Sequence, residues 1–190
     1  MATWTRTLIT AGLLTAAAAL PLAGCDDHAK ANATGGDKKT EVPKTQEVTI
    51  KGKTFKLDLV ADDASRFKGL SGRTEIPPDG GMLFVFPRPI TTSFVMRDCL
   101  VPIDIIYLDA RGSVVNTYKM TVEDARGEGE KENDPKTGVN EKYEARLKKY
   151  PSEFDTQFVI ELKGNTLDEL KLEKGDKIKL EIDKLKKLAK

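Results

Sequence analysis

Short runs in which apolar and polar residues alternate begin near residue 47 of this 190-residue chain and continue almost to its end. Val48 and Ile50 alternate with polar residues, and Phe55, Leu57 and Leu59 repeat the pattern a few positions later. A period of two is typical of a β-strand that buries one face. A Lys-Gly-Lys turn separates the two runs, so the pattern predicts a β-hairpin.

Other segments are almost continuously apolar, which is typical of strands buried on both faces. Residues 82–86 lie between glycine and proline, and residues 103–108 and 158–162 are rich in isoleucine, valine and aromatic residues. Residues 114–120 follow the second of these runs after a turn that contains glycine, which indicates another hairpin. We therefore predict a mainly β domain with one or two short helices (α+β), built as a small antiparallel barrel or sandwich.

The helices are expected at capping signals. Asp62 or Asp63 is positioned to cap a short helix that ends near Leu70. Residues 166–169 have the spacing of a capping box. After this second helix, alternating apolar residues predict a last strand, and residues 184–190 form a basic tail.

A charged segment interrupts the alternating pattern at residues 123–150. Its first part, residues 123–139, has mixed charge and no apolar periodicity, which predicts an exposed, mobile insertion. Residues 141–150 are compatible with a helix, in which Glu144 and Lys148 form a favourable pair one turn apart. A solvated loop is the simpler interpretation of the segment, and a lid or a docking arm is the alternative.

The first 24 residues have the pattern of a secretory signal peptide. Arg6 gives a positive start, an uncharged apolar stretch follows at residues 8–20, and small residues precede Cys25. The alternative is a transmembrane helix, which needs about 20 apolar residues. Pro21 interrupts this stretch and two aspartates follow Cys25, so the signal peptide is favoured.

The run Leu22-Ala23-Gly24-Cys25 resembles the lipobox of a bacterial lipoprotein. This resemblance implies that the thiol of Cys25 carries a lipid, and two or more acyl chains anchor a protein stably. Residues 25–46 contain almost no large apolar side chain, so we expect a flexible tether ahead of a single domain at residues 47–183. The protein is expected in the cell envelope, facing the periplasm or the cell exterior, with the membrane as a partner.

Composition excludes several function classes. Without residues 1–24 the chain loses only Arg6, which leaves 30 basic residues of the original 31 against 30 acidic ones, and a neutral chain predicts no nucleic-acid partner. The only histidine, His28, lies in the tether, so the domain has no histidine for nucleophilic or zinc sites. Cys99 is the only other cysteine, and we expect a buried, inert thiol. No motif indicates a metal or a cofactor.

Four charged residues stand beside apolar neighbours and are candidates for a binding site: Arg73, Arg97, Asp98 and Asp104. Buried polar groups need partners, and arginine is suited to bidentate contacts with anions. The cluster could hold a small polar or anionic ligand, with Phe94 and Met96 as apolar walls. The alternative is an ion-pair network that pins the strands together.

The chain resembles the widespread bacterial and archaeal family called domain of unknown function 192. The motifs Gly69-Leu70-Ser71-Gly72-Arg73 and Ser93-Phe94-Val95-Met96-Arg97-Asp98 carry the resemblance, together with residues 81–86, 101–109, 158–162 and 174–176. It covers roughly residues 48–183 and implies a small, mostly β domain, often exported or lipid-anchored. Val95 stands where the family pattern has a large aromatic residue, and Asp98 where it has an amide.

The function expected from the sequence is that of a membrane-anchored envelope module that binds a small ligand or a protein partner. Two alternatives stay open. One is a hydrolase that uses carboxylates without histidine, for which Asp98 and Asp104 are candidates. The other is a structural or accessory protein that interacts with an envelope protein through the charged segment.

Overall fold

The computed structural model describes residues 44–190. The expected signal peptide, Cys25, His28 and nearly all of the expected tether lie outside the described residues. Among the described residues, no helix is long and apolar enough to cross a membrane. The elements are, in order, β1 (Thr45–Ile50), β2 (Lys53–Val60), α1 (Asp63–Lys68), β3 (Gly80–Ile90), β4 (Ser93–Phe94), β5 (Ile103–Leu108), β6 (Val114–Met120), α2 (Glu141–Arg146), β7 (Tyr150–Pro151), β8 (Thr156–Lys163), α3 (Thr166–Leu170) and α4 (Ile182–Leu188).

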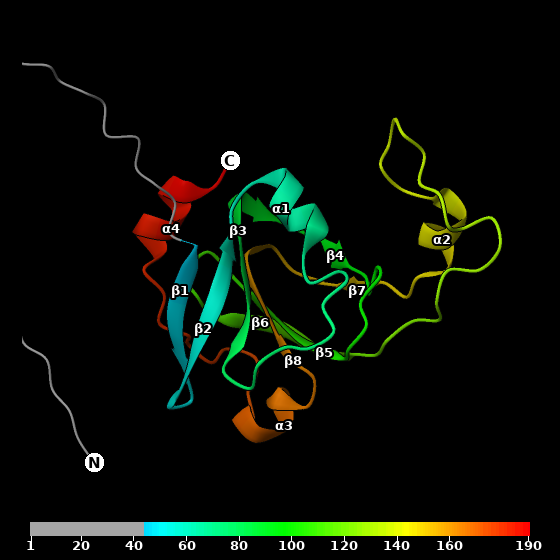
Figure 1. Ribbon diagram of the computed structural model, residues 1–190. Coiled ribbons are helices and arrows are strands. Elements are labelled where there is room, and N and C mark those ends of the chain that lie inside the picture. Colours follow the sequence, from blue (N-terminus) through cyan, green and yellow to red (C-terminus); the bar gives the residue numbers. More distant parts are fainter. Residues whose placement is uncertain (1–43) are drawn as a thin grey trace, which may run out of the picture. The chain divides into compact units, whose positions relative to one another are not determined.

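Six of the strands form one sheet in the order β1-β2-β3-β8-β5-β6, and β4 and β7 form a small second sheet (Figure 1). The predicted hairpins β1–β2 and β5–β6 are both present. The prediction of a mainly β, α+β domain is confirmed. The arrangement is sandwich-like, and the six-stranded sheet of the described residues does not close into a barrel.

One pair of strands departs from the antiparallel expectation. β2 and β3 run parallel, with Asp58 opposite Met82 and Val60 opposite Phe84. Parallel neighbours need a crossover connection, which a helix usually supplies. α1 and the turns after it form that crossover, and Asp62 caps the helix by accepting a 3.0 Å hydrogen bond from the backbone N–H of Ser65. The crossover brings α1 beside the sheet, where it helps to form the candidate site.

The sheet is covered on both faces. One apolar cluster includes Phe158, Ile160 and Leu162 of β8 together with residues of α3 and α4. The other includes Val159 of β8, Phe84 of β3 and residues of the α1 crossover and of β7. Because side chains alternate along a strand, Glu161 shares the face of Val159. This second face carries the candidate site.

The C-terminal segment differs from its expected form. The expected strand before it is reduced to one isolated bridge, between Ser113 and Lys177. Residues 182–188 form α4, in which Leu185 is fully buried against the first apolar cluster. The residues assigned to a basic tail are therefore mostly helix, because a leucine and an isoleucine on one side of the segment bury against the sheet.

Close approach of two strands requires glycine at one position near the site. A Cβ atom at Gly81 would lie 2.2 Å from the backbone oxygen of Glu161, and the residue has a φ of +152°. By contrast, Gly52 in the β1–β2 turn has a φ of +84° and open space around it. Gly81 thus lets β3 pack against β8 beside Glu161.

We expect Gly81→Ala to destabilise the protein by more than about 3 kcal/mol, because the clash involves backbone that cannot move aside. Gly52→Ala should cost only about 1 kcal/mol, the strain of a left-handed residue without a clash. Urea unfolding of both variants measures the difference. Equal losses would show that β3 and β8 can separate at this point without penalty.

Candidate functional site

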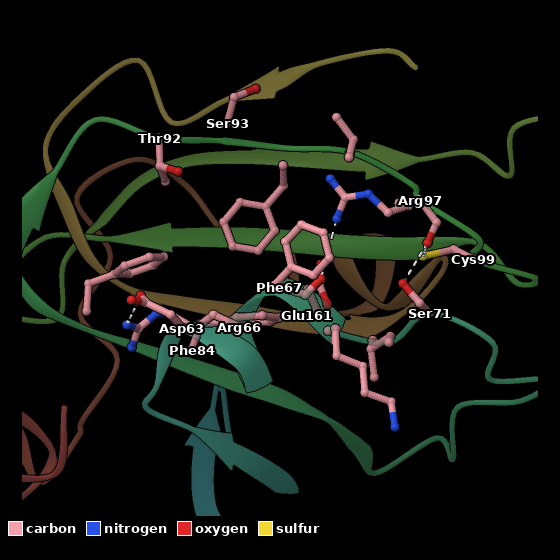
Figure 2. A pocket seen from close by; sticks show the side chains of 16 residues that line it. Asp63, Arg66, Phe67, Ser71, Phe84, Thr92, Ser93, Arg97, Cys99 and Glu161 are labelled. Atoms are coloured by element: carbon pink, nitrogen blue, oxygen red, sulfur yellow. Dashed lines mark hydrogen bonds and ion pairs between the residues drawn. The ribbon is translucent and has the colours of Figure 1, made fainter. Parts of the chain in front are cut away.

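A pocket opens on the second face of the sheet. Its volume is about 390 Å³, and it is lined by Asp63, Arg66, Phe67, Lys68, Gly69, Leu70, Ser71, Phe84, Phe86, Thr92, Ser93, Phe94, Val95, Arg97, Cys99 and Glu161. Figure 2 shows Glu161 near the middle of the pocket, with Arg97 and Cys99 toward one end and Asp63 and Arg66 toward the other. The walls therefore come from α1, β3, β4, β8 and the turns between them.

Glu161 is the most deeply buried charged side chain of the pocket. The residue is 4% exposed, and its Oε2 atom has no hydrogen-bond partner among the described residues. Burial raises the pKa of Glu161 to about 8, against the opposing effect of the positive charge of Arg73. A buried carboxyl group without a partner is costly to stabilise. At neutral pH it is mainly protonated, so it can donate one hydrogen bond into the pocket and accept others.

Aromatic rings line the same pocket as this carboxyl group. The rings of Phe84 and Phe94 meet edge to face with centroids 5.1 Å apart, and Phe94 meets Tyr107 in the same way at 5.8 Å. Such contacts are favourable beyond the area that they bury. Phe84 is almost fully buried, whereas Phe67 on α1 is 50% exposed at the surface. The pocket thus has aromatic walls, arginines at both ends and the buried carboxyl group of Glu161 near its middle.

Arg66 fixes one end of the pocket. Its Nη1 atom donates to the backbone oxygen of Val85 at 2.7 Å, and its Nη2 atom pairs with Asp63, also at 2.7 Å. The guanidinium lies 5.2 Å from the centre of the Phe86 ring. The side chain is 9% exposed, so these contacts hold α1 firmly against β3.

Arg97 forms the other end. Its guanidinium lies 4.4 Å from the centre of the Phe67 ring and makes a bidentate ion pair with Glu144 of α2, with a 2.8 Å bond from Nη2 to Oε2. The hydrogen bond to Glu144 raises the pKa of Arg97 above its usual value. Arg97 therefore links the pocket to the charged segment.

Cys99 lies beside Arg97 in the pocket lining. Burial raises the pKa of its thiol to about 12, with a further contribution from the nearby carboxyl of Glu161. Nucleophilic cysteines need a lowered pKa. The thiol is therefore protonated at neutral pH and behaves as an apolar wall of the pocket.

The charged segment is held to the domain by ion pairs and stacked rings. Arg126 makes a bidentate pair with Asp98 at 2.7 and 2.8 Å, and Arg146 pairs with Glu130 at 3.0 Å. The two arginines contact the ring of Tyr143 at 4.1 and 4.8 Å. Glu130 and Tyr143 are buried, so this part of the segment is more than a solvated loop. Figure 1 shows α2 and its neighbouring loops apart from the main sheet.

The six candidate residues do not meet in one place. Phe94 and Arg97 line the pocket, whereas Met96 is 1% exposed within the second apolar cluster. Asp98 faces Arg126, and Arg73 pairs with Asp58 at 2.5 Å. The expected cluster of two arginines and two aspartates is therefore not formed: Arg73, Arg97 and Asp98 belong to three separate ion pairs, and Asp104 to none among the described residues.

Asp104 has a structural contact of its own. The residue is 1% exposed, and its Oδ2 atom accepts a 2.7 Å hydrogen bond from the backbone N–H of Leu167. Asn165, the N-cap residue of α3, makes no side-chain cap bond, so Asp104 supplies the missing acceptor from β5. Burial raises the pKa of Asp104 against the opposing effect of this bond. Asp98 and Asp104 therefore do not form a carboxylate pair in the pocket.

Glu161 was not among the residues singled out from the sequence. A usable signal was present, because Glu161 is the one charged residue in the apolar run 158–162. The same argument selected Asp104, which lies between two isoleucines. Sequence alone does not show which of two such acids finds a partner. Among the described residues, no group of three or more histidine, cysteine or acidic side chains could hold a metal ion.

Comparison with known proteins finds one family model and two similar crystal structures. The model of DUF192, described as "Uncharacterized ACR", matches residues 46–180. A protein of unknown function from Novosphingobium aromaticivorans is 25% identical with a TM-score of 0.56, over 72% of this chain and 85% of that chain. A Sinorhizobium meliloti protein provisionally named a transcription regulator is 22% identical with a TM-score of 0.52, over 71% and 90%. The second likeness shows the fold alone. No curated protein matches the chain.

We expect the buried carboxyl of Glu161 to make stability depend on pH. The unfolded chain loses this proton near pH 4.5 and the folded chain near pH 8, so the folded state binds more protons between these values. The contribution of Glu161 to the free energy of unfolding is therefore fully present below pH 4.5. It decreases by about 1 kcal/mol per pH unit as the pH rises from 4.5 toward 8.

Glu161→Gln keeps the shape of the side chain and removes its charge, so the variant should lack this loss. Urea unfolding at a series of pH values tests the difference, with the exposed Glu75→Gln as the control that keeps the wild-type profile. A wild-type profile in Glu161→Gln would mean that Glu161 is ionised in the folded protein at neutral pH.

Proposed function

The chain belongs to the DUF192 family, and from the geometry of its pocket we propose that it is a small-molecule-binding module held at the cell envelope by a lipidated Cys25. The pocket is the binding site. Its polar contact is Glu161, and its walls include Phe67, Phe84 and Phe94.

The observation that carries this proposal is the unpartnered carboxyl of Glu161. A group that is 4% exposed and lacks a hydrogen-bond partner costs stability, of the order of 1–3 kcal/mol. The two other buried acids outside the pocket have partners, since Asp104 accepts from Leu167 and Glu130 pairs with Arg146. A ligand that hydrogen-bonds to Glu161 would offset the cost while its apolar part fills the space between the rings.

Binding is better supported than hydrolysis. A hydrolase that uses two carboxylates needs both of them at the reacting bond. The only other acid in the pocket lining is Asp63, which is committed to Arg66 and lies on α1 at one end. Cys99 is protonated and the lining contains no histidine, so a nucleophile with an adjacent base is also missing from it.

The envelope location rests on the sequence of the first 25 residues. An apolar, uncharged stretch is followed by Leu22-Ala23-Gly24-Cys25, which resembles a lipobox. A lipidated Cys25 would confine the pocket to the neighbourhood of a membrane, where its ligands would be small molecules of the envelope.

The pocket is tested with phenethyl alcohol, an uncharged probe for the aromatic walls. We expect millimolar probe to shift the NMR signals of the pocket lining, and Phe67→Ala to weaken binding about fivefold through loss of ring contacts. Phe154→Ala is the matched control, because Phe154 is 53% exposed, close to the 50% of Phe67, and does not line the pocket. If both variants weaken binding of phenethyl alcohol equally, or if the probe shifts NMR signals outside the pocket lining, the pocket is not the binding site.

The anchor is tested with the two cysteines of the chain. In a bacterial host, we expect Cys25→Ala to move the protein from the membrane fraction to the soluble fraction, because the lipid attachment point is lost. Cys99→Ala should stay with the membrane, since that thiol lies in the pocket wall. A membrane-bound Cys25→Ala protein without incorporated fatty acid would instead indicate an uncleaved apolar segment as the anchor.

A further inference from the structure

We propose that the ligand of this pocket is an organic acid, whose carboxylate forms a hydrogen bond with the buried, unpartnered carboxyl group of Glu161 while its apolar body lies among the phenyl rings. This inference rests on the proposed function, because it assigns a chemical class to the ligand of the same site. Three observations support it: the charge of the pocket lining, the unpartnered carboxyl group of Glu161, and the arginine side chains that lie over two of the phenyl rings.

The lining has an excess of positive charge. It contains three cations, Arg66, Lys68 and Arg97, and besides Glu161 only one acid, Asp63. The partner of Arg97, Glu144, lies outside the lining, and counting it still leaves one positive charge without a matching acid. The unmatched cation is Lys68, whose side chain is exposed, so with Glu161 neutral the lining has a modest preference for an anion over a cation.

The depth of the pocket supplies a hydrogen-bond donor. The Oε2 atom of Glu161 is buried and lacks a hydrogen-bond partner. A neutral carboxyl group has one O–H donor, which needs an acceptor. A hydrogen bond from a neutral carboxyl to a carboxylate is short and roughly twice as strong as one between neutral groups. A ligand carboxylate is thus the acceptor that satisfies Glu161 best.

Two of the four phenyl rings in the lining already have a cation of the protein over one face. Arg66 lies over Phe86 at 5.2 Å, and Arg97 lies over Phe67 at 4.4 Å. A cationic ligand would compete with these guanidinium groups for the same rings and would be repelled by them. The edges and remaining faces suit an apolar ligand body.

The charged and titratable groups around Glu161 define how pH acts on it. The positive charge of Arg73 opposes the effect of burial on the pKa of Glu161, and Cys99 and Tyr107 are close enough to be influenced by the charge of Glu161. Burial raises the pKa values of both Cys99 and Tyr107, so both stay neutral at mildly alkaline pH. The remaining charged groups are those of the lining: Asp63, Arg66, Lys68 and Arg97. Above pH 8, ionised Glu161 would no longer donate and would repel a carboxylate.

Three probes of similar shape test the charge: phenylacetate, phenethylamine and phenethyl alcohol. Their affinities for the mature protein are measured by NMR titration near pH 6.5 and near pH 9.5. We expect phenylacetate to bind tightest of the three at the lower pH and to lose about tenfold in affinity per pH unit above the pKa of Glu161. Glu161→Gln keeps a donor that does not titrate, so its affinity for phenylacetate should change little between the two pH values.

The outcomes separate the ligand class from the site. If phenethylamine binds more tightly than phenylacetate, and more so at high pH, the ligand is not an organic acid. The assignment of the pocket as a binding site would still hold in that case. Phenylacetate binding that is independent of pH in the wild type, or that falls equally in Glu161→Gln, would overturn the role of the Glu161 proton. If none of the three probes shifts the signals of the pocket lining, the proposed binding function itself is wrong.

Discussion

The position of β8 at the centre of the sheet is the constraint on which the structure depends. β8 pairs with β3 on one side and with β5 on the other, and apolar clusters cover both of its faces. Any polar side chain on this strand is separated from bulk water and must find a partner within the protein or in a pocket. Glu161 finds none among the described residues, which explains both its raised pKa and the chemical character of the site.

The same constraint explains why other polar residues of the core are structural. Asp104 lies on β5, one strand away from β8, and bonds to the N-terminal turn of α3. Thr156, also buried, donates to the backbone oxygen of Leu108 at 2.7 Å. Each satisfies a nearby backbone group and thereby fixes the arrangement of elements. Glu161 differs because the element that passes over it, α1 with its following turn, leaves a space lined by rings.

The charged segment at residues 123–150 makes ion pairs with the rest of the domain that its composition does not predict. Its many charges predicted an exposed, mobile insertion, and most of residues 123–139 are exposed, but Arg126 and Glu130 of this range form ion pairs with Asp98 and Arg146. Arg126 and Arg146 both contact Tyr143, while Asp98 and Arg97 connect the segment to the turn beside the pocket. The partners in the ion pairs are distant in sequence, from 16 residues for the Arg146–Glu130 bond to 47 for the Arg97–Glu144 bond, so no local pattern reveals these pairs.

Local patterns in the sequence determined the mainly β class, the two hairpins, the cap of α1 and the family, because each depends on residues a few positions apart. The capping box expected at residues 166–169 was wrong, because α3 begins after Asn165 and its cap comes from Asp104 of β5. The tertiary structure decided the parallel pairing of β2 with β3, the helix at residues 182–188, and which of the polar residues in apolar strands has no partner. The physical reason is that pairing and burial depend on contacts between distant segments. Asp104 and Glu161 have similar local sequence, yet only the fold gives one of them a bond and the other a pocket.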